Sequence, residues 1–530
     1  MGILPMTAHG LEARATRLRL TRQGAKRMVG RKSPRDRGAT NHMKILLSCI
    51  SSLLLVAGSA LAQQPLFHTV DLDVGGTERI QFADGKSATV KLVAVNETRD
   101  KARSAIRDAR VDIEIDGARG TLSCGNYRLP VTLGEFQVDC PVVKAYYQNT
   151  DHDHWGLTKD ARLRLWPKGS PYMPPGSFVY PVHQKWFASR TQMGNEPTYV
   201  DGGELITSKK VYYHAGLDIG GTEGLVDVVA ATDGTVVGVG TAMVDAEKNN
   251  ASLDHDFNDT IWVEDARGWY HRYTHLYSFD PEVKLGGHVR MGQKVGTIGK
   301  EGGSGGWSHL HYEIVSRQPS GKLGTQEGYA FLWEAYRRQY KPSLIAVARP
   351  HQAVLIGEKA TLDGSRSWGA FQIAKYEWTF TDDGKASGAK VEKSYAKVGT
   401  YSEILKITDD RGRTAYDFET VNVMDPRHPD QVPPSIQATY FPTMDLAPGK
   451  PITFKVRTFG TTDGEETWSF GDGTNATTKS DGNVDEHAKN GFAVTTHAFT
   501  KPGDYIVRVE RSNALGQKAM AHLWVHVGGE

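Results

Sequence analysis

The C-terminal part of the chain contains an internal repeat, and this repeat sets the tightest limit on the fold. Residues 376–384 (YEWTFTDDG) resemble residues 466–474 (ETWSFGDGT), and residues 394–412 (SYAKVGTYSEILKITDDRG) resemble residues 497–516 (HAFTKPGDYIVRVERSNALG). Both copies alternate apolar and polar residues between Asp-Gly turns, as half-buried strands do. Their separation matches one β-sandwich of ~100 residues. The repeat therefore predicts two successive sandwich domains.

The repeated stretches resemble PKD (polycystic-kidney-disease-type) domains. They share the W-x-F-x-D-G core at Trp378 and Trp468, an aromatic-x-x-x-G-x-Y strand entry and a closing strand. The resemblance implies Ig-like sandwiches over residues 346–427 and 428–530, which serve as extracellular spacers or ligand binders and keep their aromatic residues in the cores. One extra residue precedes Gly384 in the first copy, so we expect its turn to differ.

The rest of the chain also has a β-type pattern. Glycine accounts for 57 of the 530 residues, and short alternating segments lie between turn residues throughout. We expect an N-terminal β domain over residues 63–175, closed by the linker PKGSPYMPPGS (167–177). A second β-rich unit over residues 176–345 ends in a short helix around 328–340, which Pro342 stops. The predicted fold class is an all-β multidomain protein.

The N-terminal region is predicted to be a leader. Met43 opens MKILLSCISSLLLVAGSALAQQ, with a basic start, a short apolar run and a small-x-small end at Ala60 to Ala62. This is the pattern of a signal peptide over residues 43–62, and the run is shorter than the ~20 residues of a spanning helix. Residues 1–42 are then either part of a longer leader (1–62) or an over-extended reading frame. We expect export, with no stable membrane anchor after cleavage.

Removal of the leader changes the charge of the protein. Residues 1–62 contain 11 basic and 2 acidic residues, so their loss takes the formal net charge from +2 to −7. Because nucleic-acid binding depends on positive charge, no nucleic-acid partner is expected.

Cysteine use is compatible with export. Cys49 lies in the leader, which leaves Cys124 and Cys140. Two cysteines in an exported β domain predict one disulfide, which would close a loop of about 15 residues and stabilise the fold by about 3 kcal/mol. The alternative is a pair of buried free thiols. Neither arrangement supports a four-cysteine metal site.

The segment SHLHYEI (308–314) has a chemically informative pattern. His309, His311 and Glu313 share one parity, so on a strand they face one side while the apolar residues between them face a core. Two imidazoles at this spacing lie about 7 Å apart at Cα and can converge on a metal ion or a substrate. Taken alone, the pattern is more often structural than catalytic.

A second segment, YYHAGLDIGG (212–221), places His214 four residues before Asp218. On a straight strand the two residues would be about 13 Å apart, too far to share one ion. Gly216 between them permits the required bend. Two histidines and one aspartate are a reasonable zinc set with a fourth position left for water. A third segment, WYHRYTHLYS, offers His271 and His275, and composition does not choose between them.

In this order, the three motifs resemble the zinc metallopeptidases of family M23 (the lysostaphin/LytM type). The glycine patterns VVAATDGTVVGVG and HVRMGQKVGTIGKEGGSGG between the motifs also match, and the resemblance spans about residues 205–316. It implies an antiparallel-sheet peptidase domain with one Zn²⁺. Carried over by position, the zinc ligands are His214, Asp218 and His311, and the catalytic histidines are His309 and His275.

His271 matches nothing in the M23 pattern and is predicted to be a strand-surface histidine. The chain departs from the pattern in two places: Trp307-Ser308 stands where Gly-Pro is common, and residues 241–259 look like an insertion. Both affect the walls of the substrate groove. Glu313 is a candidate support for His309 or His311. No HExxH occurs, so a histidine poised near neutral pH is the natural general base.

A competing motif lies in the same region. Residues 302–306 (GGSGG) fit GxSxG, the nucleophile elbow of serine hydrolases, but that motif needs a strand before it and a helix after it. A glycine-rich groove loop is the favoured interpretation.

The sequence therefore predicts an exported zinc metalloendopeptidase that cleaves the peptide part of bacterial peptidoglycan. Two alternatives remain: a secreted metalloprotease acting on proteins, and a non-catalytic wall-binding or adhesive protein on a peptidase fold.

Overall fold

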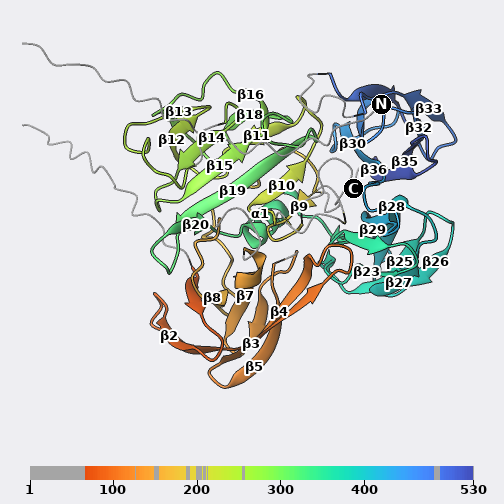
Figure 1. The fold of residues 1–530 in the computed structure, drawn as a ribbon. Coiled ribbons are helices and arrows are strands. Elements are labelled where there is room, and N and C mark those ends of the chain that lie inside the picture. The colour runs from red at the N-terminus through yellow and green to blue at the C-terminus, as the bar shows by residue number, and fades with distance from the viewer. Residues whose placement is uncertain are drawn as a thin grey trace, which may run out of the picture. The chain divides into compact units, whose positions relative to one another are not determined.

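The computed structural model describes residues 66–528 except 126, 148–153, 187–190, 198–205, 207–210, 212, 254–256 and 483–489. The predicted leader, residues 1–62, lies outside the described residues. Among the described residues, strands account for 48% and helix for 3%, which confirms the predicted all-β class. The strands form several sheets, one of which joins strands from two successive domains (Figure 1).

Among the described residues, no helix combines the length and the apolar character that a membrane crossing requires.

The N-terminal domain consists of two four-stranded antiparallel sheets, in the orders β1-β8-β7-β6 and β2-β3-β4-β5. Its elements are β1 (His68–Leu72), β2 (Thr77–Gln81), β3 (Ser87–Arg99), β4 (Ile106–Ile115), β5 (Ala118–Ser123), β6 (Val131–Leu133), β7 (Phe136–Val143), a 3₁₀ turn (Lys144–Tyr146) and β8 (Ala161–Pro167). Alternate residues of β4 are buried, as the period-2 pattern predicts. The apolar side chains of both sheets form one core cluster.

The predicted disulfide between Cys124 and Cys140 is wrong. Both residues are free thiols, buried to within 1% exposure in the core of the N-terminal domain. Burial raises the pKa of the Cys124 thiol well above its ordinary value, and the hydrogen bond with Cys140 acts in the same direction. Disulfides form by attack of a thiolate, so a protonated thiol packed as a small apolar side chain is unreactive.

The central domain is built on a nine-stranded sheet and a three-stranded sheet. In the nine-stranded sheet the strand order is β13-β12-β14-β15-β19-β10-β9, and β17 and β20 also pair with β12 and β19, respectively. The three-stranded sheet has the order β11-β18-β16. The elements are β9 (Thr191–Gln192), β10 (Leu217–Gly220), β11 (Asp227–Val229), β12 (Gly234–Val239), β13 (Ala242–Met243), β14 (Ile261–Glu264), β15 (Tyr270–Thr274), β16 (Leu276–Phe279), β17 (His288–Val289), β18 (Lys294–Ile298), β19 (His309–Arg317), β20 (Leu323–Thr325) and α1 (Tyr329–Tyr340).

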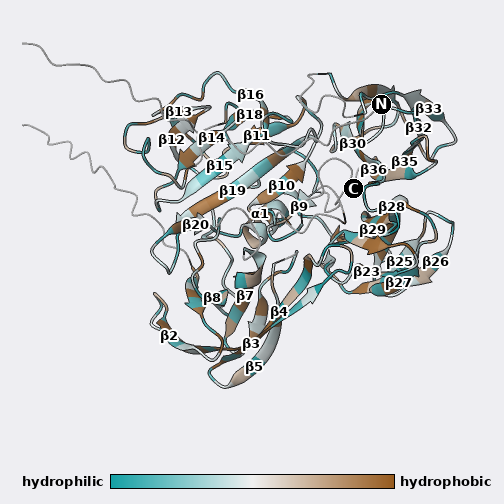
Figure 2. Ribbon diagram, in the orientation of Figure 1, coloured by the Kyte–Doolittle hydropathy of each residue, from teal (hydrophilic) through white to brown (hydrophobic). Residues whose placement is uncertain are grey.

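Strand β19 lies inside the nine-stranded sheet, where it pairs along one edge with β10 and along the other with β15. Hydrophilic and hydrophobic residues succeed one another along it (Figure 2), so one face meets the core while the other carries polar side chains. The aromatic residues of α1 pack into the same core. The helix ends at Tyr340, and the capping residue Lys341 adopts the left-handed conformation typical of a helix C-terminus.

Two sandwich domains complete the chain. Their strands are β21 (Leu344–Ile345), β22 (Gln352–Leu355), β23 (Lys359–Asp363), β24 (Trp368–Gly369), β25 (Ile373–Thr379), β26 (Lys385–Ser387), β27 (Lys390–Ser394), β28 (Gly399–Asp409), β29 (Thr414–Met424), β30 (Ser435–Phe441), β31 (Ile452–Phe459), β32 (Glu466–Ser469), β33 (Asn475–Thr478), β34 (Ala493–His497), β35 (Gly503–Ser512) and β36 (Lys518–Val527). Trp378 and Trp468 are buried at the two cores, as the repeat predicts.

The two sandwiches differ at the Asp-Gly turn and are joined by a shared sheet. Asp383 takes a positive φ of 64° in the first copy, whereas Gly471 and Gly473 take positive φ in the second. Strand β28 of the first sandwich pairs in parallel with β36 of the second, through Gly399 opposite Lys518. One nine-stranded sheet therefore runs through both domains.

Candidate metal centre and active site

The register between β10 and β19 creates the candidate metal centre. Asp218 in β10 lies directly opposite His311 in β19, and Thr274 at the end of β15 lies opposite the same histidine on the other side. Side chains from three adjacent strands therefore meet at His311. His309 lies two residues earlier, at the start of β19, and shares its face.

Three of the predicted site residues converge closely enough to hold one metal ion. His214 Nε2 lies 3.0 Å from Asp218 Oδ1 and 3.0 Å from His311 Nδ1, and His311 Nδ1 lies 2.8 Å from Asp218 Oδ1. Donor atoms about 2.1 Å from one zinc ion in tetrahedral geometry are roughly 3.4 Å apart, so an outward shift of a few tenths of an ångström would accommodate it. Among the described residues, this is the one group of three His, Cys, Asp or Glu side chains that meets the geometric requirement for a metal.

The bend predicted at Gly216 brings His214 to the site. Gly216 has a φ of +77°, a conformation that other residues rarely adopt. A Cβ atom at this position would lie 2.9 Å from the Tyr312 carbonyl oxygen and 3.2 Å from Cε1 of His311. The glycine therefore serves two purposes: it turns the chain, and it lets the segment before β10 pass close to β19.

The outer nitrogen atoms of the two candidate ligand histidines each face an oxygen atom, which leaves the other nitrogen directed inward. His214 Nδ1 lies 3.3 Å from the Met193 carbonyl oxygen, and a carbonyl can only accept, so the proton is on Nδ1 and the Nε2 lone pair is free to bind a metal. His311 Nε2 faces Glu313 Oε2 at 3.8 Å, which leaves the lone pair of Nδ1 to bind a metal. Glu313 thus supports His311, one of the two roles considered for it from the sequence.

The two predicted catalytic histidines lie beside the metal group. The ring centroids of His275 and His309 are 4.7 Å apart, and those of His275 and His311 are 6.0 Å apart. His309 Nδ1 lies 3.0 Å from the Trp307 carbonyl oxygen, so Nδ1 carries the proton and the Nε2 lone pair faces Asp218, 3.5 Å from Oδ1. The indole ring of Trp307 stacks against the His309 ring, with the ring centroids 3.9 Å apart and the ring planes at 17° to each other.

His275 is positioned by a residue that the sequence did not reveal. Strand β15 ends at Thr274, and His275 takes a positive φ of 66°, which breaks the alternation with His271 and turns its side chain toward His309. Asp259 accepts hydrogen bonds from the His275 main-chain N–H (2.9 Å) and from Nδ1 (3.0 Å). The Glu301 carbonyl oxygen lies 2.7 Å from the same Nδ1. No motif marks Asp259; it only closes the inserted segment before β14.

The electrostatics of the group favour cation binding. Burial opposes ionisation of Asp218, but the three surrounding imidazoles hold its pKa well below the ordinary value, so it is a carboxylate. Burial lowers the pKa of His309 to about 3 in spite of Asp218, so His309 is neutral and its pKa lies below the near-neutral value expected from the sequence. Burial also opposes ionisation of Asp259, yet hydrogen bonds from His275 lower its pKa.

The site is almost closed to solvent. His309 is 2% exposed, His214 and Asp218 are each 4% exposed, and His311 is 9% exposed. The candidate metal donors are therefore almost completely covered by the surrounding protein.

The prediction that His271 lies on a strand surface is wrong. His271 is fully buried, with Nδ1 2.8 Å from the Tyr312 hydroxyl and Nε2 3.1 Å from Asp265 Oδ2. Its polar partners lie inside the domain, which a sequence pattern does not show. Burial lowers the pKa of His271 in spite of Asp265.

The competing GxSxG motif does not form a nucleophile elbow. The Ser304 hydroxyl is buried, donates to the Lys300 carbonyl oxygen and accepts a hydrogen bond from the Gly306 N–H. The strand β19 follows this loop where the elbow requires a helix.

Comparison with protein families agrees with this geometry. Residues 212–322 match the model of peptidase family M23. The central domain is an M23 peptidase domain. Residues 342–423 and 437–525 each match a PKD domain model, which confirms both resemblances drawn from the sequence.

Solved structures with similar parts come from several bacteria. A protein named as a glycyl-glycine endopeptidase, LytM, from Ruminococcus gnavus is 24% identical over 30% of this chain and 60% of that chain, with a TM-score of 0.20. Csd3 of Helicobacter pylori is 13% identical over 50% of this chain and 82% of that chain (TM-score 0.20). Fibronectin(III)-like modules of Clostridium thermocellum CbhA are 12% identical over 35% of this chain and 93% of that chain (TM-score 0.15). This chain therefore spans about three fifths of the LytM structure's length.

The M23 peptidase domain thus contains a donor set that suits zinc: two imidazole nitrogens and one carboxylate oxygen, with the outer nitrogens of both histidines facing acceptors. Three protein ligands with a free fourth position are the arrangement of catalytic rather than structural zinc sites.

Replacing Gly216 tests the close approach behind the metal centre. In Gly216→Ala we expect zinc affinity to fall by about tenfold or more, because the added Cβ pushes against the Tyr312 carbonyl and the His311 ring. Gly268→Ala is the matched control, since Gly268 also has a positive φ but no atom within 4 Å of an added Cβ. Zinc affinity is measured by competition with a chelator. Equal affinity in the two variants would contradict the assigned role of Gly216.

Replacing Asp259 tests the positioning of His275. We expect Asp259→Asn to keep full zinc stoichiometry and to lose about 10- to 100-fold in turnover, as is typical for partners of catalytic and metal-bound groups. Asp265→Asn is the matched control, because Asp265 makes a similar contact with His271 (3.1 Å) away from the site. Turnover and bound zinc are measured on the same samples. A loss of zinc from Asp259→Asn, or equal activities in both variants, would refute the assignment.

Proposed function

We propose that the protein is an exported zinc metalloendopeptidase that hydrolyses peptide bonds in the peptide part of bacterial peptidoglycan. One observation carries the proposal: two imidazoles and a carboxylate converge within hydrogen-bonding distance of one another, with two further imidazoles beside them. The match to peptidase family M23 supports it. The signal-peptide pattern of residues 43–62 supports export to the cell envelope or beyond.

Zinc would be held by His214 Nε2, a carboxylate oxygen of Asp218 and His311 Nδ1. When bound, it lowers the pKa of a coordinated water towards 7 and polarises the carbonyl of the scissile bond. The Met193 carbonyl accepts from the outer nitrogen of His214, and Glu313 faces the outer nitrogen of His311 at 3.8 Å, so the inner nitrogens of both rings would be the ones to hold zinc.

His309 is suited to the role of general base. It is neutral, its Nδ1 proton is engaged with the Trp307 carbonyl, and its Nε2 lone pair faces the metal group. Nε2 can therefore take a proton from the attacking water and return it to the leaving amine.

His275 is suited to the stabilisation of the carbonyl oxygen. Its Nδ1 proton is held by the Asp259 carboxylate and the Glu301 carbonyl, which leaves Nε2 for the substrate. A proton at Nε2 would be donated as a hydrogen bond to the oxygen that gains negative charge, and the Asp259 carboxylate lies behind the ring.

A peptidoglycan digest tests the proposed reaction. The mature chain, residues 63–530, is expected to release fragments with new peptide termini from purified peptidoglycan. His309→Ala should lose about 10²- to 10⁴-fold in rate while keeping its zinc, because it loses a proton acceptor and no ligand. The matched control is His288→Ala, since His288 is an exposed histidine of the same domain. Fragments are identified by mass spectrometry.

The outcomes separate the alternatives considered for this chain. New termini from protein substrates but not from peptidoglycan would favour a protease that acts on proteins. No cleavage of either substrate by the zinc-loaded chain would contradict the proposed activity.

A further inference from the structure

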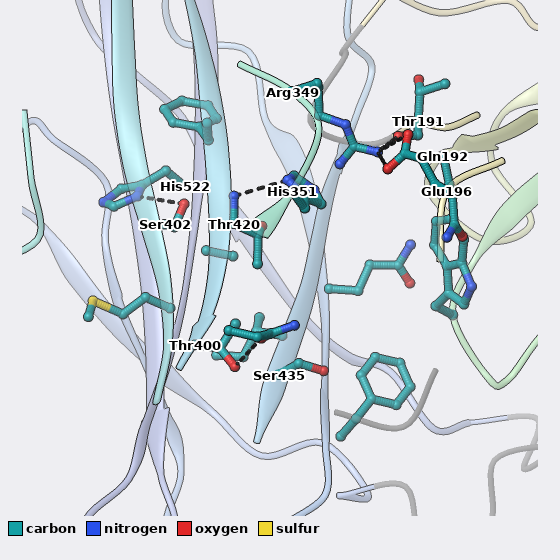
Figure 3. Close-up of a pocket in the computed structure, with 18 of the residues that line it drawn as sticks. Thr191, Gln192, Glu196, Arg349, His351, Thr400, Ser402, Thr420, Ser435 and His522 are labelled. Atoms are coloured by element: carbon teal, nitrogen blue, oxygen red, sulfur yellow. Dashed lines mark hydrogen bonds and ion pairs between the residues drawn. The ribbon is translucent and has the colours of Figure 1, made fainter. Parts of the chain in front are cut away.

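A cavity of about 170 Å³ lies between the M23 peptidase domain and the two PKD domains. It is larger than the roughly 150 Å³ that holds a benzene-sized molecule, so it has room for one ring-sized group. Its walls come from β9 and the loop before β19, from β28 and β29 of the first PKD domain, and from β30 and β36 of the second. Figure 3 shows labelled side chains from the peptidase domain and from both PKD domains around it.

The walls combine polar and apolar groups and carry little net charge. Their hydroxyl and amide side chains include Thr400, Thr420, Asn422 and Ser435. The two ionised residues in the wall, Arg349 and Glu196, neutralise each other at 3.0 Å. Burial lowers the pKa of the His522 imidazole to about 4, which keeps it neutral. Such walls favour an uncharged ligand with hydroxyl and amide groups over a phosphate or a carboxylate.

Aromatic rings complete the walls. Phe418 comes from the first PKD domain, Phe459 from the second, and Trp307 from the peptidase domain. These rings add flat apolar surface beside the polar groups, a combination that suits a ring-shaped ligand with both polar edges and apolar faces.

Two wall residues connect the cavity to the reaction centre. Trp307 lines the cavity and stacks on the His309 ring, with centroids 3.9 Å apart. Gln192 lines the cavity from β9 and lies directly opposite Asp218 in the sheet. A ligand in the cavity would therefore contact Trp307 and Gln192, and these two residues lie directly beside the candidate base His309 and the candidate metal ligand Asp218.

The second PKD domain also holds the loop that carries Trp307. The Gln437 side chain accepts a hydrogen bond from the Ser308 N–H (2.6 Å) and donates one to the Ser308 carbonyl oxygen (2.7 Å), as a paired strand would. Arg457 donates to the Gly306 carbonyl oxygen at 2.7 Å. The cavity wall is thus fixed by hydrogen bonds between domains.

We propose that this cavity is a substrate subsite that binds an N-acetylated amino sugar of the peptidoglycan glycan strand while the attached peptide is directed to the metal centre. The inference rests on the proposed function and extends it: the PKD domains take part in substrate recognition beside the active site. The sugar supplies the uncharged hydroxyl and acetamido groups that the walls match, whereas the peptide part carries ionised groups that they do not.

The test is direct binding of a probe that the peptidase does not need to cleave. The β-1,4-linked tetrasaccharide of N-acetylglucosamine is titrated calorimetrically into the mature chain. We expect Thr420→Trp, which fills the cavity from β29, to weaken binding by at least about tenfold. Thr420→Val, which removes only a hydroxyl, should weaken it by about 2- to 10-fold. Thr467→Trp, at an exposed position of β32 in a separate hollow, is the matched control and should bind like the unaltered protein.

A cleavage arm identifies which part of the polymer occupies the cavity. The measured quantity is the ratio of two cleavage rates, for intact peptidoglycan and for the same cross-linked peptides freed of glycan. Thr420→Trp should lower this ratio by about tenfold. If the tetrasaccharide does not bind, or binds Thr420→Trp as tightly as the unaltered chain, the inference is overturned even when the peptidase is active. If filling the cavity slows cleavage of the glycan-free peptides equally, the glycan assignment is overturned in favour of peptide. Sugar binding at the cavity without any peptidoglycan cleavage would instead refute the proposed function.

Discussion

The antiparallel register between β10 and β19 is the constraint on which the site depends. It places Asp218 opposite His311, and a one-residue slip would turn one of these side chains to the other face of the sheet. The core side of β19 holds Leu310, Tyr312 and Ile314, all buried to within 1% exposure, so such a slip would also expose a large apolar area. The packing that stabilises the central sheet therefore also fixes the geometry of the metal donors.

Around this register, the chain supplies partners that define the state of each imidazole. Main-chain carbonyls accept from His214 and His309, and carboxylates face His311 and His275. Because carbonyls and carboxylates only accept, each ring presents a defined nitrogen to the centre. The candidate ligand histidines and the candidate catalytic histidines, although chemically alike, therefore differ in the groups that surround them.

The sequence predicted the elements whose signal is local and missed those that depend on distant contacts. Strand alternation, the bend at Gly216 and the ordered motifs were sufficient to predict the all-β fold and the residues that the structure brings together. Cys124 and Cys140 were wrongly joined because spacing does not reveal burial as free thiols, and His271 was wrongly placed on a surface because its partners Tyr312 and Asp265 are known only from the fold. Asp259 and Gln437 act through contacts 16 and 129 residues away in sequence, and no local pattern marks them.

Zinc-edge anomalous diffraction from crystals of the zinc-loaded mature chain would locate the ion without reference to activity. We expect one strong peak per chain, within about 2.0–2.2 Å of His214 Nε2, an Asp218 carboxylate oxygen and His311 Nδ1, with a non-protein ligand in the fourth position. His309 and His275 should lie outside the coordination sphere. A peak bonded to His309 or Glu313 in place of one of these ligands, or no peak at this site, would refute the proposed metal centre.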